Sequence, residues 1–203
     1  ADTARLLKRR GLAMQEAVPI GEGAMAALLG LDLNMASEVA KLAAQGEVCS
    51  CANDNAPGQV VVSGTKKAIE RAAEIAVQKG ARRAVMLPVS APFHCALMKP
   101  AAKVMAEALN SINIQMPKVP LISNVTAAEV TDPSLISTNL VDQVTALVRW
   151  RESILYMKER NVDTFVEVGS GKVLSGLTRR ISRDLQGKSL QNPDDFDIFL
   201  KEI

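Results

Sequence analysis

Aromatic side chains, long apolar runs and an excess of one charge are all scarce in this chain. Phe, Trp and Tyr make up 3% of its 203 residues, and 24 basic residues face 22 acidic ones, a formal net charge of +2. Nucleic-acid binders carry strongly basic surfaces or stacking aromatics, so no nucleic-acid partner is expected. No apolar run is as long as a membrane span, and neither a membrane partner nor a signal peptide is expected.

Cysteine and histidine are also few. Three cysteines are an odd number without the spacing of a disulfide framework, which indicates free thiols in a reducing compartment, the cytoplasm. A zinc site would have to use Cys49, Cys51, Cys95 and the only histidine, His94. Structural zinc sites prefer pairs spaced C-x₂₋₄-C, and adjacent ligands such as His94 and Cys95 diverge. No metal site is therefore expected.

The residues that are present suit a globular α/β protein, with 48% hydrophobic and 23% charged residues. Between Gly23 and Ser90 the pattern predicts the order β-α-β-β-α-β, with strands over 23–31, 47–54, 58–65 and 82–90 and helices over 34–46 and 66–80. This order is typical of the ferredoxin-like fold. Such sheets bind RNA through aromatic residues, and this segment contains none.

The segments on either side predict a second unit. A helix is predicted over 4–18, with Leu7, Met14 and Val18 along one stripe. After His94 the pattern predicts helices over 95–111, 151–161 and 172–184, a short helix and loop over 140–150, a turn-rich stretch over 132–139, and strands over 118–124 and 163–168. Strands that alternate with helices imply a parallel sheet.

Two strands are too few for a doubly wound sheet, so the larger domain is expected to lack its N-terminal half. The predicted organisation is a large-domain helix over 1–19, a small domain over 20–91 and the remainder of the α/β large domain over 92–203.

Three local features have both a plain and a functional interpretation. The stretch EVGSGKVLSG, from Glu167 to Gly176, lacks the glycine spacing of a phosphate loop and is interpreted as a strand-to-helix turn whose helix N-terminus favours anions. His94 follows a strand in a crossover, where α/β proteins gather catalytic groups, although a lone histidine is more often structural. Arg10 borders an apolar stripe beside Met14, so it either snorkels or holds an anion.

Four segments occur in order between about Arg5 and Arg183. They are RRGLAMQEAVPIGEGAMAALLGL, CANDNAPGQVVVSG, PVSAPFHCALMKPA and EVGSGKVLSGLTRRI. They resemble, in turn, an R-G-x-x-M-Q segment, an A-N-x-N-x-P-x-Q-x-V-I-S-G motif, a loop with a catalytic histidine and an E-x-G-x-G-x-V-L segment. In these four segments the chain resembles the malonyl-CoA:acyl carrier protein transacylases of bacterial fatty-acid synthesis.

The resemblance implies an α/β-hydrolase-like acyltransferase domain that is interrupted by the ferredoxin-like small domain. It also implies ping-pong transfer of a malonyl group from coenzyme A to the phosphopantetheine thiol of acyl carrier protein through an acyl-serine. No permanently bound cofactor is expected, since malonyl-CoA is a substrate, and the protein is expected to be a monomer.

The same resemblance assigns the candidate site. His94 matches the general base, and the main-chain carbonyl of Gln143 matches the group that holds its second nitrogen, so substitution of Gln143 is expected to matter little. Arg10 matches the residue that grips the malonyl carboxylate.

Four further residues are expected around the substrate. Met14 would line the pocket, and Asn53 and Asn55 would shape it. Phe93, directly before the base, resembles the Phe-His pair that goes with malonyl selection in related polyketide acyltransferases.

The sequence departs from the family in one respect, because it contains neither G-H-S-x-G nor G-Q-G-S-Q. The nucleophilic serine is expected upstream of Ala1, and this chain alone is not expected to become malonylated. The alternative is a short, non-catalytic paralogue that binds acyl carrier protein or an acyl-CoA. Arg179, Arg180 and Arg183 form either a docking surface for the acidic carrier or a solvated helix face.

Overall fold

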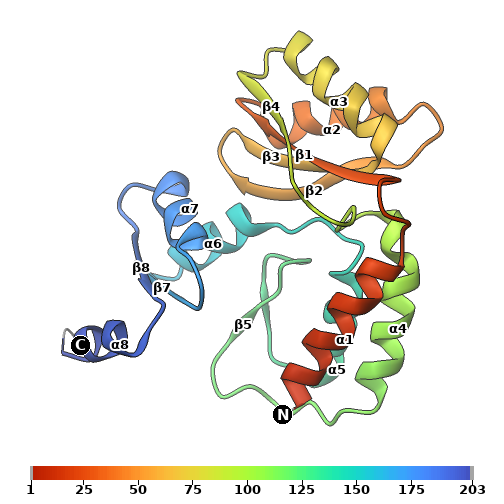
Figure 1. Cartoon of the computed structure of the whole chain (residues 1–203). Helices are drawn as coiled ribbons and strands as arrows, with labels where there is room; N and C mark the ends of the chain where they lie inside the picture. Colours follow the sequence, from red (N-terminus) through yellow and green to blue (C-terminus); the bar gives the residue numbers. More distant parts are fainter. Residues whose placement is uncertain (1, 202–203) are drawn as a thin grey trace.

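A four-stranded antiparallel sheet with two helices forms the upper part of the molecule in Figure 1. The computed structural model describes residues 2–201. The elements are β1 (Gly23–Leu29), α2 (Leu33–Ala44), β2 (Cys49–Ala56), β3 (Gln59–Thr65), α3 (Lys66–Gln78) and β4 (Arg83–Met86). Their order is the β-α-β-β-α-β order that the sequence predicts, and the strands lie in the order β2-β3-β1-β4.

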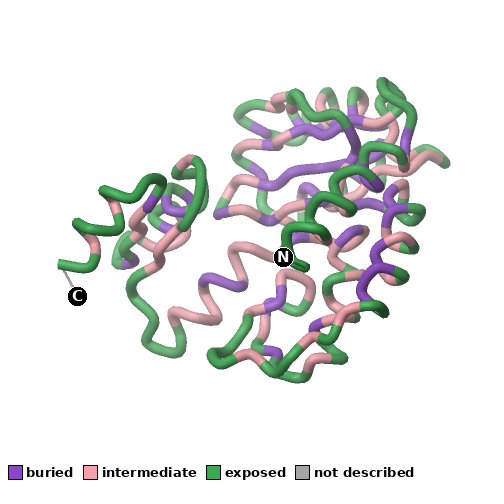
Figure 2. The backbone as a smooth tube through the Cα atoms, turned by 60° about the horizontal axis from the view of Figure 1, so that its bottom comes forward, coloured by how far each residue is buried: buried purple, intermediate pink, exposed green. Residues whose placement is uncertain are grey.

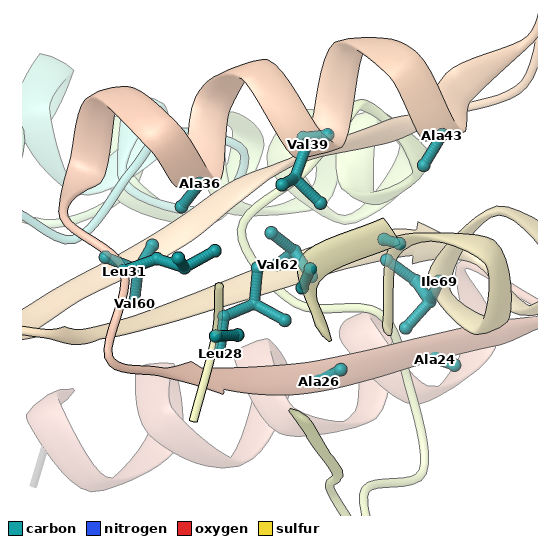
Figure 3. Close-up of a cluster of buried hydrophobic side chains, with 14 residues drawn as sticks. Ala24, Ala26, Leu28, Leu31, Ala36, Val39, Ala43, Val60, Val62 and Ile69 are labelled. Carbon is teal, nitrogen blue, oxygen red and sulfur yellow. The ribbon is translucent and has the colours of Figure 1, made fainter. Parts of the chain in front are cut away.

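One face of this sheet and the two helices enclose the largest buried core (Figure 3). Leu28, Val60 and Val62 project from the strands toward α2 and α3, and each is fully buried. Val39 of α2 and Ile69 of α3 fill the space between them, while the alanines of both helices allow close approach to the sheet. Burial of a side chain of this size contributes about 1.5–3 kcal/mol, so this core is a main source of stability for the small sheet.

A pair of helices, α1 (Asp2–Glu16) and α4 (Lys99–Asn110), packs below the sheet (Figure 1). Met14 and Val18 are buried at this interface as predicted, whereas Leu7 is 63% exposed, contrary to the predicted stripe. The two connections between this layer and the sheet touch each other, because a Cβ on Gly23 would lie 2.3 Å from the Pro92 ring. Only glycine permits this approach, which fixes where the loop after β4 runs.

The remaining chain forms short elements. They are the 3₁₀ turn η1 (Ala96–Met98), β5 (Leu121–Ile122), β6 (Glu129–Val130), α5 (Pro133–Asp142), α6 (Trp150–Lys158), β7 (Thr164–Val168), α7 (Val173–Ile181), β8 (Gln186–Leu190) and α8 (Pro193–Phe199). β7 and β8 form a parallel pair, and β5 and β6 an antiparallel one. Buried residues are concentrated in the sheet and the helices around it, while α8 contains no buried residue (Figure 2).

Several predicted elements differ from the observed ones. Of the strand predicted over 118–124, only the two residues of β5 form a strand, because Pro117 and Pro120 cannot donate hydrogen bonds to a neighbouring strand. β5 pairs with β6 and not with β7. The strand predicted over 82–90 ends at Met86, two residues before Pro88. β8 and α8 are additional elements that the sequence pattern did not reveal.

The turn-rich stretch predicted over 132–139 is helical in the structure. It forms most of α5, where the Asp132 carboxylate accepts a hydrogen bond from Ser134 N at 2.7 Å and Pro133 occupies the first turn. Aspartate and proline mark turns and helix starts alike. Of the short helix and loop expected over 140–150, residues 140–142 are the last residues of α5, residues 143–149 form the connection, and α6 begins at Trp150.

Within residues 2–201, none of the helices is long and apolar enough to cross a membrane. Ala1 and residues 202–203, which belong to the first and last predicted segments, lie outside the described residues.

Candidate active site

His94 lies in the crossover between β4 and η1, and its backbone is in the left-handed region with φ of 59°. A residue with a Cβ pays roughly 1–3 kcal/mol for such a conformation unless its surroundings enforce it. The neighbours do enforce it, because Pro92 packs on Gly23 and accepts a hydrogen bond from the Cys95 thiol at 3.2 Å. These contacts hold the His94 backbone in the left-handed region, which fixes the direction of the imidazole.

The His94 ring is fixed by one main-chain contact. Its Nδ1 lies 2.8 Å from the carbonyl oxygen of Gln143. A carbonyl only accepts, so Nδ1 carries the proton and Nε2 keeps its lone pair. Among residues 2–201, Nε2 has no hydrogen-bond partner. The geometric expectation of a His94–Gln143 contact is thus met.

The protonation equilibrium of His94 favours a neutral base. Burial lowers the pKa of His94 below its ordinary value, the Gln143 carbonyl acts in the opposite direction, and the positive charge of Arg10 lowers it further. A neutral imidazole with a free lone pair at neutral pH is the state that a general base requires.

Gln143 can present its carbonyl because it ends a helix. It is the C-cap of α5, and its own N–H is bonded to Asn139 O at 2.9 Å. The last carbonyls of a helix lack partners within it, so the end of α5 supplies a free acceptor. The adjacent Val144 is fully buried in the α1–α4 core and anchors this end.

Arg10 reaches the same residue from α1. Its Nη2 donates to the Gln143 side-chain oxygen at 2.8 Å, and this contact is part-buried. Among residues 2–201 it has no carboxylate partner, and burial lowers the pKa of its guanidinium. A half-buried cation without an anionic partner is a natural recognition group for an anion.

Arg10 and Gln143 border a hollow of about 320 Å³ beside α1, α5 and the β5–β6 pair. Apolar side chains form most of its wall, with Asn124, Asn139 and Ser123 as further polar groups. The structure therefore brings His94, Gln143 and Arg10 together, with Arg10 at the edge of an open space.

The other four candidates are more dispersed. Met14 is 3% exposed in the core between α1 and α4, and Phe93 packs between that core and the lower face of the sheet. Asn53 and Asn55 are half-buried on β2. None of the four lines the hollow beside Arg10, and their roles stay predictions.

Asn124 and the side chain of Gln143 are polar groups that the sequence did not point to. The Gln143 Nε2 lies 3.5 Å from the Asn124 side-chain oxygen, and the Gln143 Oε1 accepts from Arg10. The expectation that substitution of Gln143 matters little took only its carbonyl into account. Asn124 follows β5, and no periodic pattern or motif distinguishes it.

The glycine turn after β7 is closed to an added anion. The Glu167 carboxylate accepts from Leu174 N at 3.1 Å and from Ser175 N at 2.8 Å, so it occupies the N-terminus of α7. The anion-binding interpretation of this helix start is therefore wrong.

The cysteines are poor ligands and nucleophiles. Burial raises the pKa of Cys49 and of Cys51 to about 11, so both thiols stay protonated at neutral pH. No group of three or more metal-ligating side chains occurs within the described part of the chain.

Comparison with known proteins places this architecture in a family. Residues 1–189 match the model of the acyl transferase domain, and the chain belongs to this family. It is 42% identical to the malonyl CoA-acyl carrier protein transacylase of Bacillus subtilis over 100% of the chain and 64% of that relative. The Escherichia coli K12 transacylase is 47% identical over 95% of the chain and 62% of that relative.

Solved structures agree. The acyl-carrier-protein-S-malonyltransferase of Bartonella henselae superposes with a TM-score of 0.94 at 51% identity, over 99% of this chain and 64% of that one. A malonyl-transacylase in complex with a type II PKS acyl-carrier protein gives a TM-score of 0.94 at 41% identity, over 98% and 64%. The chain spans somewhat less than two thirds of the length of these relatives.

Proposed function

We propose that the protein carrying this chain transfers a malonyl group from coenzyme A to the phosphopantetheine thiol of acyl carrier protein. The observation that carries the proposal is the joint placement of a neutral base, His94, and an unpaired cation, Arg10, on the two polar groups of Gln143. The names of the relatives and the carrier-bound neighbour structure support the same substrate and partner.

The reaction proceeds through an acyl-serine, and the serine lies upstream of Ala1. His94 Nε2 takes the serine proton as the serine oxygen attacks the thioester carbonyl. The C–S bond breaks, and the proton passes from His94 to the departing thiolate of coenzyme A. In the second half, His94 deprotonates the carrier thiol, which attacks the acyl-serine and returns the serine with its proton.

Arg10 binds the malonyl carboxylate in this scheme. Its planar guanidinium offers paired donors, and it already lies at the edge of the hollow beside Gln143. In the same proposal Met14 would line the acyl pocket, Asn53 and Asn55 would shape it, and Phe93, directly before the base, would favour malonyl.

The same proposal covers the architecture. Residues 20–91 would be a ferredoxin-like insert, which the strand order β4-β1-β3-β2 supports, between the 1–19 and 92–203 parts of an α/β-hydrolase-like domain. We place the protein in the cytoplasm on the basis of its three free cysteines, and we propose, from the resemblance alone, that it is a monomer.

The test is malonyl transfer by the full-length protein, followed by mass spectrometry of both the enzyme and holo-acyl carrier protein. Wild type should form a malonyl-serine and then discharge it to the carrier. His94→Ala should lose about a hundred-fold or more of the transfer rate. Lys103→Ala, on the exposed side of α4, serves as the matched control and should transfer like wild type. Carrier binding without any covalent enzyme would favour the non-catalytic alternative.

A further inference from the structure

The side chain of Gln143 is built into a chain of three polar side chains. Arg10 Nη2 donates to Gln143 Oε1 at 2.8 Å, and Gln143 Nε2 lies 3.5 Å from Asn124 Oδ1. Both contacts are part-buried and link α1, the end of α5 and the segment after β5. Asn124 is itself tied at the backbone, where its carbonyl accepts from Arg149 N at 3.0 Å.

The chemistry of the three groups fixes the direction of this chain. A guanidinium only donates, so the oxygen of the Gln143 amide must face Arg10. The amide nitrogen then faces away and needs an acceptor, which the oxygen of Asn124 provides. A reversed amide would set donor against donor at Arg10 and acceptor against acceptor at Asn124 Oδ1, so both neighbours favour the orientation that holds the guanidinium.

The side-chain amide of Gln143 is neutral, and this decides what it can do to the charge of Arg10. Gln143 uses one of the five N–H donors of Arg10 without cancelling its charge. A glutamate at the same place would hold Arg10 more strongly but would neutralise it before any substrate arrives. A neutral acceptor therefore orients the cation and leaves its charge available to an anionic ligand.

We propose that Gln143 is a positioning residue for acid recognition, in which its side-chain amide, oriented by Asn124, aims Arg10 at the substrate carboxylate while its main-chain carbonyl aims His94. One residue thus sets the geometry of the base and of the cation together. This inference rests on the proposed malonyl transfer and adds a determinant of its specificity.

The test uses the full-length protein and compares kcat/KM for malonyl-CoA with that for acetyl-CoA. Gln143→Glu and Gln143→Met both retain the main-chain carbonyl that holds His94. Gln143→Glu should lower the malonyl-to-acetyl ratio by about ten-fold or more, chiefly through the KM for malonyl-CoA, because the carboxylate pairs with Arg10. Gln143→Met removes the amide, and with it the acceptor for Arg10, without adding a charge, so it should lower the ratio less, by about two- to ten-fold.

Two further variants separate positioning from general damage. Asn124→Leu should lower the ratio in the same direction as Gln143→Met but more weakly. In an Arg10→Ala background, Gln143→Glu should leave the ratio unchanged within about two-fold, since a double-mutant cycle isolates the shared interaction. Thermal unfolding of each variant establishes that it is folded, and Gln143→Met carries the test if Gln143→Glu does not fold.

The outcomes are distinct. An unchanged ratio in Gln143→Glu, or an equal loss with and without Arg10, would overturn the role of the amide while malonyl transfer by wild type stands. No transfer by wild type would overturn the proposed function and this inference together.

Discussion

Two regions of the molecule bury an arginine in opposite ways. At the junction between β2 and α6, Arg151 donates from Nε to both oxygens of Asp54 at 3.1 and 2.9 Å and from Nη2 at 2.8 Å. At the hollow beside α1, the only partner of Arg10 among residues 2–201 is the neutral side-chain oxygen of Gln143 at 2.8 Å. The first arginine is neutralised within the fold, and the second keeps its charge available.

The surroundings of the two arginines differ in the same sense. The junction includes main-chain hydrogen bonds from Asp54 N to Val148 O at 2.9 Å and from Val148 N to Ala52 O at 2.8 Å, which join the small sheet to the segment before α6. The hollow is bordered by exposed Leu7 and Leu121 and holds no acidic side chain. The charge of Arg151 is thus satisfied within the fold, whereas the charge of Arg10 stays available to an anionic ligand, as the proposed function requires.

The largest effect is expected on stability at the junction. Arg151→Ala leaves the Asp54 carboxylate, whose side chain is 2% exposed, buried without a charged partner. Breaking such a pair costs about 3–5 kcal/mol, which denaturant unfolding of the full-length protein would detect. Arg10→Met is the matched control and should lose little, since no carboxylate depends on Arg10.

Asp54→Ala sharpens this prediction, because Arg151 has a side chain that is 30% exposed and can turn toward water. Asp54→Ala should therefore lower the free energy of unfolding less than Arg151→Ala does. Equal losses in Arg151→Ala and Arg10→Met would erase the distinction between the two regions.

The next effect is on substrate choice at the hollow. If Arg10 binds the malonyl carboxylate as proposed, Arg10→Ala removes a contact worth about 1.5–3 kcal/mol, so malonyl transfer should fall by roughly ten- to a hundred-fold. Acetyl transfer should hold steady or rise, because acetyl carries no carboxylate. Arg10→Lys keeps the charge without the planar fork and should restore only part of the loss. Steady-state kinetics with both thioesters would reveal an equal loss for the two if Arg10 were purely structural.

A smaller effect is expected on the pH profile. Burial and the charge of Arg10 lower the pKa of His94, so the acid limb of kcat/KM should lie below the ordinary histidine value of about 6.5. As pH falls through the folded-state pKa, His94 takes a proton and can no longer act as the proposed general base. Arg10→Ala removes one cause of the lowering and should move this limb to higher pH.

The same shift has a consequence for stability, whose sign follows from linkage. Unfolded His94 binds a proton at its ordinary pKa, and folded His94 does so only at lower pH. The unfolded state therefore binds more protons below about pH 6.5, and stability falls as pH decreases through this window. NMR titration of the single imidazole would measure the folded pKa, and a value above the ordinary one would contradict both statements.

The local sequence pattern predicted the elements of the small sheet, but it did not predict several of the short elements elsewhere in the chain. The strands β1 and β3 contain apolar runs and helix α3 has an apolar stripe, and a glycine follows β1 and α3 closely, so these elements could be predicted. β8, with the sequence QGKSL, is polar and contains a glycine, and it is a strand because β7 pairs with it in parallel. Tertiary pairing of this kind leaves no periodic signal.

The candidate site likewise has a part that the sequence predicted and a part that only the structure revealed. The loop around His94 has a recognisable local sequence, and the resemblance supplied the Gln143 carbonyl as its partner. The contact between the side chains of Arg10 and Gln143 joins residues that are 133 positions apart, and Asn124 enters only through that contact. Such polar contacts depend on how α1 and α5 pack, which composition and periodicity do not determine.

Arginines that are exposed to water differ from both Arg151 and Arg10, and their substitution is expected to change the transfer rate least. Arg180 donates to Gln59 of β3 at 2.7 Å, while Arg179 and Arg183 are exposed on and just after α7. If the latter two attract an acidic carrier, Arg179→Glu and Arg183→Glu should slow transfer to the carrier by a few-fold at low salt. Exposed charges contribute only about 0.2–1 kcal/mol each and are screened, so the loss should shrink at high salt. Equal slowing at both salt concentrations, or none, would leave these arginines as a solvated helix face, whose charge serves neither the fold nor the reaction.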